Sequence, residues 1–359
     1  MNLPHLIDLD DLQVSCWDKL IALAGEISQN SGAYYGRLTG KLMATLFYEP
    51  STRTQMSFQT AMHRLGGAVI GFDNPLNSSV AKGESLKDTI KIISGYADIL
   101  VIRHPVEGSA KAASLYSSCP VINAGDGGHL HPTQTLTDLV TLRQEKGRLN
   151  NLVLGMCGDL KNGRTVHSFL KAMSRYPNNR FVLISTPELR IPDYLRAILR
   201  ANGCPFEEVY SLEEAIPELD VLYMTRIQKE RFASEAEYVA QKNVYTLDAQ
   251  KLETAKFALK IMHPLPRVDE ISYEVDTDPR AIYFKQAKYG VYARMALILM
   301  LFEGDIPPAP GVYQDPESAF ACENQRCITH TERYLPHLAG GTPEHPDCLY
   351  CSTGGVAKQ

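Results

Sequence analysis

One stretch decides the predicted fold: Lys41-Leu42-Met43-Ala44-Thr45-Leu46-Phe47-Tyr48-Glu49-Pro50-Ser51-Thr52-Arg53-Thr54. Its first part, residues 41–48, is an apolar run with the length of one buried β-strand. Beyond residue 54, apolar residues recur at helical spacing until Gly66-Gly67 interrupts the pattern. The stretch therefore predicts a strand, a turn at Pro50, and a helix that Ser51 or Thr52 caps.

The start of this predicted helix has the chemistry of a phosphate site. The first N–H groups of a helix have no partner within the helix, and the helix dipole is positive there. The hydroxyls of residues 51, 52 and 54 and the guanidinium of Arg53 add donors that suit a tetrahedral oxyanion. Taken alone, the stretch also fits an ordinary capped helix with an exposed arginine.

The rest of the chain alternates between strand and helix patterns, which predicts parallel sheets with right-handed crossovers. A first helix is expected within residues 8–28 and a long apolar helix at 288–302, while 73–84 is polar and is expected to form a mobile loop. Further strands are expected at 68–72, 99–102, 121–123, 152–156, 181–184, 208–210, 221–224 and 258–262. Ligands of such sheets bind at the carboxyl ends of the strands. Residues 51–54, Arg103 and His131 each follow a strand, so we expect them to converge on one crevice.

Length and charge limit the classes of function. The chain has 359 residues, enough for about two domains with their own cores. A formal net charge of −5 argues against nucleic acid or an anionic membrane as the main partner. No run approaches the roughly 18 uninterrupted apolar residues of a membrane span, and no secretory signal is visible. We therefore expect a cytoplasmic protein.

Cationic side chains gather at the predicted strand ends and loops of this acidic chain: Arg53, Lys82, Arg103, His131, Arg164, Arg226 and, as a seventh candidate, Arg267. Their placement suggests a pocket for more than one anion, although each arginine could instead pair with a surface carboxylate. A glycine loop at 155–164 lacks the G-x-G-x-x-G spacing, so a nicotinamide-dependent dehydrogenase is not favoured.

Longer motifs carry a resemblance. They are residues 47–54, the loop 78–86, Arg103-His104-Pro105, 123–127, His131-Pro132-Thr133-Gln134-Thr135, 158–161, 163–168, 223–231 and His263-Pro264-Leu265-Pro266-Arg267. In collinear order over about residues 3–305, the chain resembles the aspartate/ornithine carbamoyltransferase family. Ornithine-type members carry a His-Cys-Leu-Pro segment, whereas His263-Pro264-Leu265-Pro266 and Arg226-Ile227-Gln228 resemble the aspartate-specific branch. A guanidinium at Arg226 suits a dicarboxylate.

The resemblance implies transfer of a carbamoyl group from carbamoyl phosphate to the amine of L-aspartate, an early step of de novo pyrimidine biosynthesis. It implies two doubly wound parallel-sheet α/β domains joined by interdomain helices: 1–149 with the helix 288–304 for carbamoyl phosphate, and 150–287 for aspartate. The implied catalytic residues are Arg53, Thr54, Lys82, Arg103 and His131. The implied carbamoyl-phosphate ligands are Ser51, Thr52, Arg53, Thr54, Arg103, His131, Gln134, Leu265 and Pro266. The implied aspartate ligands are Ser79, Lys82, Arg164, Arg226 and Gln228.

The resemblance further implies a homotrimer in which a neighbouring subunit supplies Ser79 and Lys82. No cofactor is expected to be needed for the chemistry. Two alternatives remain: a carbamoyltransferase that acts on another amine, and an inactive subunit retained for assembly or regulation.

The last part of the chain, residues 306–359, is expected to be a linker and a zinc-ribbon-like module. Cys322-x4-Cys327 and Cys348-x2-Cys351 have the paired spacing of a tetrahedral zinc site. Disulfides are the alternative, which a cytoplasmic setting disfavours. Residues 322–329 also resemble the zinc domain of the family's separate regulatory chain, so a structural Zn²⁺ is expected, and higher assembly through the module is possible in principle. No counterpart of that chain's nucleotide-binding domain is visible in the sequence.

Overall fold

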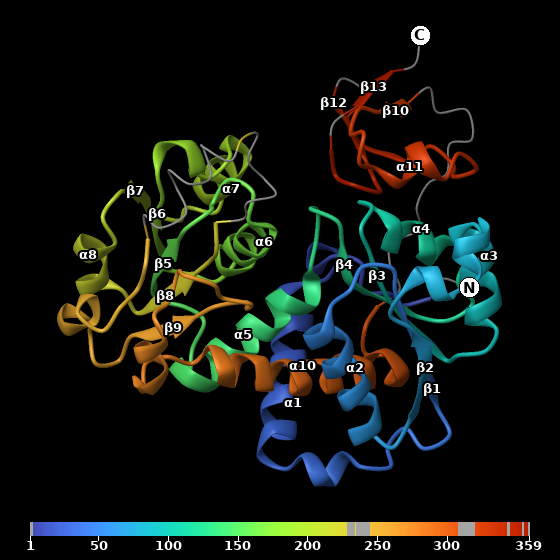
Figure 1. Cartoon of the computed structure of the whole chain (residues 1–359), viewed down its shortest axis with the longest axis horizontal. Helices are drawn as coiled ribbons and strands as arrows, with labels where there is room; N and C mark the ends of the chain where they lie inside the picture. The colour runs from blue at the N-terminus through green and yellow to red at the C-terminus, as the bar shows by residue number, and fades with distance from the viewer. Residues whose placement is uncertain are drawn as a thin grey trace. The chain divides into compact units, whose positions relative to one another are not determined.

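The structure, a computed structural model, describes residues 3–227, 234, 245–307, 320–342, 345–353 and 355–357. The chain forms two compact units (Figure 1): unit 1 comprises residues 1–133 and 291–359, and unit 2 comprises residues 134–290. The chain passes from one unit to the other within α5 (Pro132–Lys146) and within α10 (Tyr283–Glu303).

Unit 1 is built on a four-stranded parallel sheet with the order β2-β1-β3-β4. Its strands are β1 (Leu42–Phe47), β2 (Ala68–Phe72), β3 (Ile99–His104) and β4 (Val121–Asp126). Its helices include α1 (Val14–Gln29), α2 (Thr52–Arg64), α3 (Leu86–Ser94) and α4 (Ser109–Tyr116). Five of the six residues of β1 are buried, as in parallel sheets that are covered on both faces. The apolar stripe of α2 is likewise buried at Phe58, Ala61 and Met62.

Two local expectations need correction. The stretch 73–84 is not without regular structure, because it contains the 3₁₀ turns Pro75–Asn77 and Ser79–Lys82. The side chains of Asn74 and Ser78 accept hydrogen bonds from the N–H groups two residues on, and such local bonds stabilise turns that hydrophobic periodicity does not reveal. The long helix α10 begins at Tyr283, earlier than its apolar pattern suggests.

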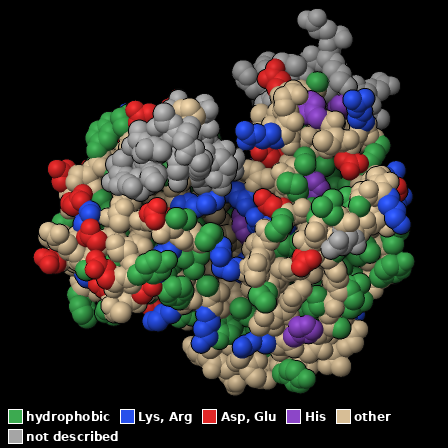
Figure 2. Space-filling model, viewed as in Figure 1, with side chains coloured by type: hydrophobic (Ala, Val, Ile, Leu, Met, Phe, Trp, Pro, Cys, Tyr) green, Lys and Arg blue, Asp and Glu red, His purple; other side chains and the backbone are tan. Residues whose placement is uncertain are grey.

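Unit 2 is built on a five-stranded parallel sheet with the order β7-β6-β5-β8-β9. Its strands are β5 (Val153–Cys157), β6 (Arg180–Ile184), β7 (Phe206–Val209), β8 (Val221–Met224) and β9 (Lys260–Met262), and its helices include α6 (Arg164–Met173), α7 (Asp193–Ala201) and α8 (Leu212–Ala215). Figure 2 shows acidic and basic side chains interspersed over the face of unit 2 that is in view. The predicted architecture of two parallel-sheet α/β domains is confirmed.

The C-terminal part of unit 1 is a small antiparallel module. Strand β10 (Phe320–Cys322) pairs with β13 (Gly355–Ala357), and β11 (Ala339–Thr342) pairs with β12 (His345–Cys348). A single helical turn, α11 (Ile328–Thr331), lies between β10 and β11 in sequence. The buried side chains of the module share one apolar cluster with residues of α3 and α4. We call the described residues of this segment, 320–342, 345–353 and 355–357, the cysteine module.

Within the described residues, no helix combines the length and the apolar character that crossing a bilayer requires.

Candidate active site and metal centre

The junction between β1 and α2 presents hydroxyl and cationic groups at a helix start. Ser51 occupies the N-cap position, but its side chain makes no capping hydrogen bond, contrary to the expected cap. Thr52 and Arg53 are exposed, and Thr54 is buried. The Ser51 hydroxyl is therefore not committed to capping the helix.

Arg103 reaches the same junction from β3. It lies opposite Phe47 in the parallel register of β1 and β3, and its carbonyl accepts a hydrogen bond from the Tyr48 N–H at 2.8 Å. Its guanidinium is buried, donates to the carbonyl of Ala124 at 3.2 Å, and forms an ion pair with Glu49 at 2.8 Å. Its Nε has no hydrogen-bond partner among the described residues. A buried donor of this kind is costly unless a ligand satisfies it.

Two guanidinium groups lie close enough to influence one another. Although Arg53 is exposed as a residue, partial desolvation of its guanidinium lowers its pKa, and the positive charge of Arg103 lowers this pKa further. Burial also lowers the pKa of Arg103, while Glu49 opposes this shift. Both groups stay protonated at neutral pH because an arginine pKa lies far above 7. Adjacent positive charges at a helix start form an environment that an anion stabilises.

His131 enters the site from the loop after β4. Asp126 closes this loop, because its N–H donates to the carbonyl of Leu130 at 3.2 Å and its carboxylate accepts from the Leu130 N–H at 2.9 Å. His131 follows immediately, is buried, and precedes the first residue of α5. The segments that carry residues 51–54, Arg103 and His131 belong to or follow β1, β3 and β4, which are neighbouring strands of one parallel sheet. That their side chains converge on one crevice stays a prediction.

Ser79 and Lys82 are not brought into this group. Both are exposed on the 3₁₀ turn that precedes α3. Their turn lies between β2 and α3, whereas the residues named above belong to or follow β1, β3 and β4.

Unit 2 carries the arginines expected to bind carboxylates. Arg164 is the first residue of α6, which follows β5, and Arg226 follows β8. Strands β5 and β8 are hydrogen-bonded neighbours, so both arginines follow the ends of adjacent parallel strands. Gly158 makes the close approach of these two strand ends possible: a Cβ there would lie 2.3 Å from the carbonyl oxygen of Thr225, and its φ is +119°.

Leu265 and Pro266 follow β9, the neighbour of β8. Leu265 has a φ of +49°, and its N–H donates to Nδ1 of His263 at 2.7 Å. Nε2 of His263 in turn lies 2.8 Å from the carboxylate of Glu270, so a buried pair fixes the loop that presents the two residues.

Two further expectations in unit 2 concern Arg267 and Gln228. Arg267 forms an ion pair with Asp276 and stacks 4.6 Å from the ring centroid of Tyr273, so it is engaged in the structure of the unit. Gln228 lies outside the described residues.

Buried acids escaped the sequence reasoning. Asp138 accepts from Gln134 at 2.8 Å, from the Tyr223 hydroxyl at 2.9 Å and from Gln286 at 2.6 Å, and thereby fixes the expected ligand Gln134. The partly exposed Glu49, which pairs with Arg103, was equally unforeseen.

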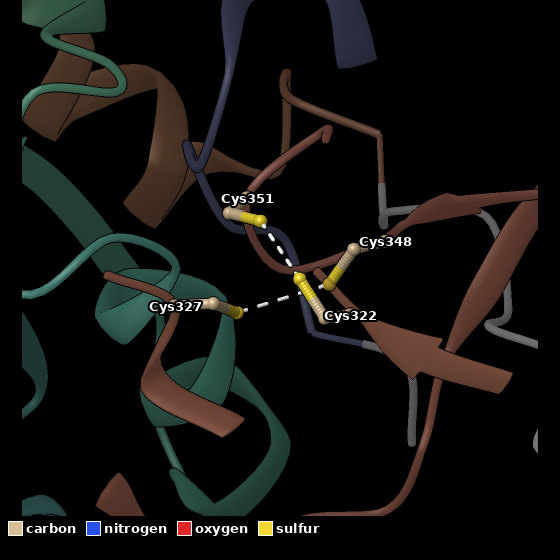
Figure 3. A group of neighbouring side chains, drawn as sticks. All are labelled: Cys322, Cys327, Cys348 and Cys351. Carbon is tan, nitrogen blue, oxygen red and sulfur yellow. Dashed lines mark hydrogen bonds between the residues drawn. The ribbon is translucent and has the colours of Figure 1, made fainter. Parts of the chain in front are cut away.

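The four C-terminal cysteines form one cluster, with their sulfur atoms facing one another (Figure 3). Sγ of Cys322 lies 3.5 Å from Sγ of Cys351, and Sγ of Cys327 lies 3.8 Å from Sγ of Cys348. All four sulfur atoms lie within 4.8 Å of one another. A tetrahedral ion with Zn–S bonds of about 2.3 Å would separate its ligands by about 3.8 Å, whereas a disulfide needs about 2.05 Å. The cluster therefore fits a tetrahedral metal ion.

Comparison with known proteins places this geometry in a family. Residues 4–144 match the carbamoyl-P binding domain of aspartate/ornithine carbamoyltransferase, and residues 150–301 match its Asp/Orn binding domain. Neither match reaches the four clustered cysteines.

Similar proteins extend over the same region. The aspartate carbamoyltransferase catalytic subunit of Clostridium perfringens is 58% identical over 298 residues, which are 83% of this chain and 97% of that subunit. The catalytic subunit of M. jannaschii aspartate transcarbamoylase has a TM-score of 0.80 and 48% identity, over 84% of this chain and 99% of that one. The Trypanosoma cruzi enzyme in complex with carbamoyl phosphate and aspartate has a TM-score of 0.76 and 37% identity, over 82% and 94% of the two chains. This chain therefore belongs to the aspartate/ornithine carbamoyltransferase family.

Proposed function

We propose that the chain is an aspartate carbamoyltransferase, which forms N-carbamoyl-L-aspartate and phosphate from carbamoyl phosphate and L-aspartate. The observation that carries the proposal is the pair of neighbouring guanidinium groups, Arg53 and buried Arg103, at the start of α2. Similarity to catalytic subunits over nearly their whole length supports the same reaction. The product is a precursor suited to pyrimidine biosynthesis, and a cytoplasmic location fits such a role.

Unit 1 would bind the phosphorylated donor. Ser51, Thr52, Arg53, Thr54 and Arg103 are the proposed ligands of the phosphate group. Thr54, Arg103 and His131 would donate to the carbonyl oxygen, and Gln134 would contact the amino group. Leu265 and Pro266 of unit 2 would contribute backbone carbonyl oxygens.

The reaction follows from these contacts. The uncharged amine of aspartate attacks the carbonyl carbon, a C–N bond forms, and negative charge develops on the carbonyl oxygen. Donors aimed at that oxygen stabilise the transition state, and the loss of one typically raises the barrier by about 2.7–4 kcal/mol. The C–O bond to phosphate then breaks, and the departing phosphate accepts the proton of the amine. These steps need neither a metal nor a protein nucleophile.

Unit 2 would select the acceptor. Arg164 and Arg226 are the proposed partners of the two carboxylates of aspartate, with Gln228 assisting. A guanidinium binds a carboxylate through two parallel hydrogen bonds, so two such groups favour a dicarboxylic amine over ornithine. We assign carbamoyl-phosphate binding to residues 1–149 with helix 288–304, and aspartate binding to residues 150–287.

Ser79 and Lys82 would complete the site of a neighbouring subunit. Their exposure on a turn leaves both side chains accessible, which fits a role in another copy of the chain. We therefore propose a homotrimer with shared active sites.

The test is a carbamoyl-transfer assay with isotope-labelled carbamoyl phosphate and a panel of amino acids. We expect carbamoyl-aspartate as the product; label on another amino acid would support the alternative acceptor, and no transfer at all would support an inactive subunit. Arg226→Ala should raise the KM for aspartate by about 100-fold, as expected for the loss of a charged partner of about 2–3 kcal/mol. Arg200→Ala, at an exposed position on α7, is the matched control and should leave this KM unchanged.

The four cysteines would hold a structural Zn²⁺. Thiolate ligands and tetrahedral geometry are typical of zinc, and a site closed by four ligands leaves no position for a substrate. The hydroxyl of Thr329 donates to Sγ of Cys327 at 3.3 Å, an outer contact of the kind that orients ligating side chains. The module's likeness to the zinc domain of a regulatory chain makes further assembly of trimers through it an additional proposal, to be tested by measuring the mass of the zinc-loaded protein in solution.

A further inference from the structure

The cysteine module contacts three segments of unit 1 that lead to proposed substrate-binding residues. The segments are the loop after β3, the loop after β4, and the start of α3. The loop after β3 follows Arg103, and the loop after β4 ends at His131. The start of α3 follows the turn that carries Ser79 and Lys82. Each contact is made by a different part of the module.

The first contact is a backbone ladder at Glu107. Its N–H donates to the carbonyl of Arg326 at 3.1 Å, and its carbonyl accepts from the Ile328 N–H at 2.9 Å. Its carboxylate accepts from the amide of Asn324 at 2.6 Å. Next to it, a Cβ on Gly108 would lie 2.6 Å from Cβ of Tyr350, so the backbone of the loop packs directly against the module.

The second contact runs through His129. Its Nε2 lies 3.2 Å from the hydroxyl of Ser352, and its Nδ1 lies 3.1 Å from the carboxylate of Asp126. The same carboxylate accepts from the Gly108 N–H at 2.9 Å. Asp126 also closes the loop that presents His131, so the module, this loop and the loop after β3 share one hydrogen-bonded network.

The third contact caps α3. The carboxylate of Glu332 accepts from the Leu86 N–H at 3.1 Å, and the hydroxyl of Tyr334 accepts from the Lys87 N–H at 2.8 Å. The hydroxyl oxygen of Ser85 accepts from the following N–H group, that of Asp88, at 3.1 Å. The first turn of a helix has N–H groups without helical partners, and here the module satisfies two of them. A carboxylate at this end is also favoured by the helix dipole.

We propose that the cysteine module is a positioning element for catalysis, and that Glu332 and Tyr334 act as positioning residues for the turn that carries Ser79 and Lys82. This inference rests on the proposed function. The turn is short and exposed, and its path is fixed by its two ends: β2 on one side and the start of α3 on the other. If the start of α3 loses its two acceptors, the turn gains freedom, and the aspartate contacts expected of Ser79 and Lys82 are formed less often.

The test compares two single substitutions, Tyr334→Phe and Glu332→Ala, with a control at the residue between them in sequence. Tyr334→Phe keeps the ring, which lies 5.4 Å from the Lys87 ammonium, but removes the hydroxyl; Glu332→Ala removes the carboxylate. We expect each to raise the KM for aspartate by about three- to tenfold, the range of one lost hydrogen bond, with a smaller change in the KM for carbamoyl phosphate. Arg333→Gln, at an exposed position, should leave both KM values unchanged.

A second measurement separates positioning from general destabilisation. Hydrogen–deuterium exchange should become faster at the amides of Leu86 and Lys87 in both variants, while zinc content and the melting temperature stay close to those of the unmodified chain. Unchanged KM values and unchanged exchange in both variants, with an active parent enzyme, would overturn the inference. An inactive parent enzyme would instead overturn the proposed function, a result that the assay of the unmodified chain identifies first.

Discussion

Replacement of Arg103 gives the sharpest prediction about the candidate active site. Arg103→Ala removes the buried guanidinium that donates to Ala124 at 3.2 Å and pairs with Glu49 at 2.8 Å. The carboxylate of Glu49 then loses its partner. Because the Glu49 side chain is 35% exposed, water screens much of this cost, and we expect a loss of only about 1–2 kcal/mol in the free energy of unfolding.

The expected effect on catalysis is larger. The loss of one preorganised donor to the developing oxyanion costs about 2.7–4 kcal/mol, which lowers kcat by about 100- to 1,000-fold. A typical domain has about 5–15 kcal/mol of stability, so the variant should stay folded while it loses activity. Arg103→Lys keeps the positive charge but loses the planar set of guanidinium donors, so its kcat should lie between those of Arg103→Ala and the parent enzyme.

The assay measures carbamoyl-aspartate formation at saturating carbamoyl phosphate, alongside urea unfolding. Arg143→Ala is the matched control, because Arg143 is exposed near the end of α5 and donates to the carbonyl of Gly147 at 2.7 Å. It should keep kcat and lose less than about 1 kcal/mol of stability. A folded Arg103→Ala variant with kcat within threefold of the parent would refute the assignment of Arg103 to the reacting group.

Three further predictions concern pH, metal and backbone. Burial lowers the pKa of His104 to about 4, so between about pH 6.5 and pH 4 the unfolded chain binds a proton that the folded chain excludes. The free energy of unfolding should therefore fall by up to about 3 kcal/mol as the pH drops through this range, and His104→Gln should reduce this pH dependence in urea unfolding. Cys327→Ser should abolish stoichiometric zinc binding in metal analysis, because all four thiolates are needed to close the site. Cys204→Ser, at a buried thiol outside the cluster, should keep the zinc, and zinc retained by Cys327→Ser would count against the site. Gly158→Ala should destabilise unit 2 by more than about 2 kcal/mol, since the new Cβ would collide with the carbonyl of Thr225. Gly147→Ala, where φ is +72° and the described atoms leave open space, should destabilise it by only about 1 kcal/mol, and equal losses in thermal unfolding would contradict the steric explanation.

The sequence predicted the strands whose ends carry the candidate site residues. Residues 51–54 and His131 follow strands with clear apolar runs, Arg103 lies near the end of another, and parallel sheets place such ends along one edge. The ion pair of Arg103 with Glu49 could not be predicted from the sequence, because it depends on the strand register in which Phe47 lies opposite Arg103. A period of apolar residues predicts that two strands are buried but not how they are aligned.

The contacts of the cysteine module were equally hidden from sequence reasoning. Cysteine spacing predicted the cluster, since four thiolates need only short-range geometry to surround an ion. The hydrogen bond from the Leu86 N–H to Glu332 instead joins residues that are 246 positions apart. No local pattern marks a single glutamate as the partner of a particular helix start, and only the folded chain identifies it.

The size of the module determines how metal loss would act on unit 1. A segment this short buries too little apolar surface to fold without help, and structural zinc supplies about 10–16 kcal/mol of apparent affinity in such segments. Without metal, the contacts at Glu107, His129 and Leu86 should therefore disappear together rather than one at a time. Each contact is individually modest, but covalent linkage to unit 1 keeps the module at high effective concentration, so weak contacts suffice while the module is folded. If the cluster holds the proposed Zn²⁺, metal content and the order of the three segments that lead to the proposed substrate-binding residues should change together, as one two-state property.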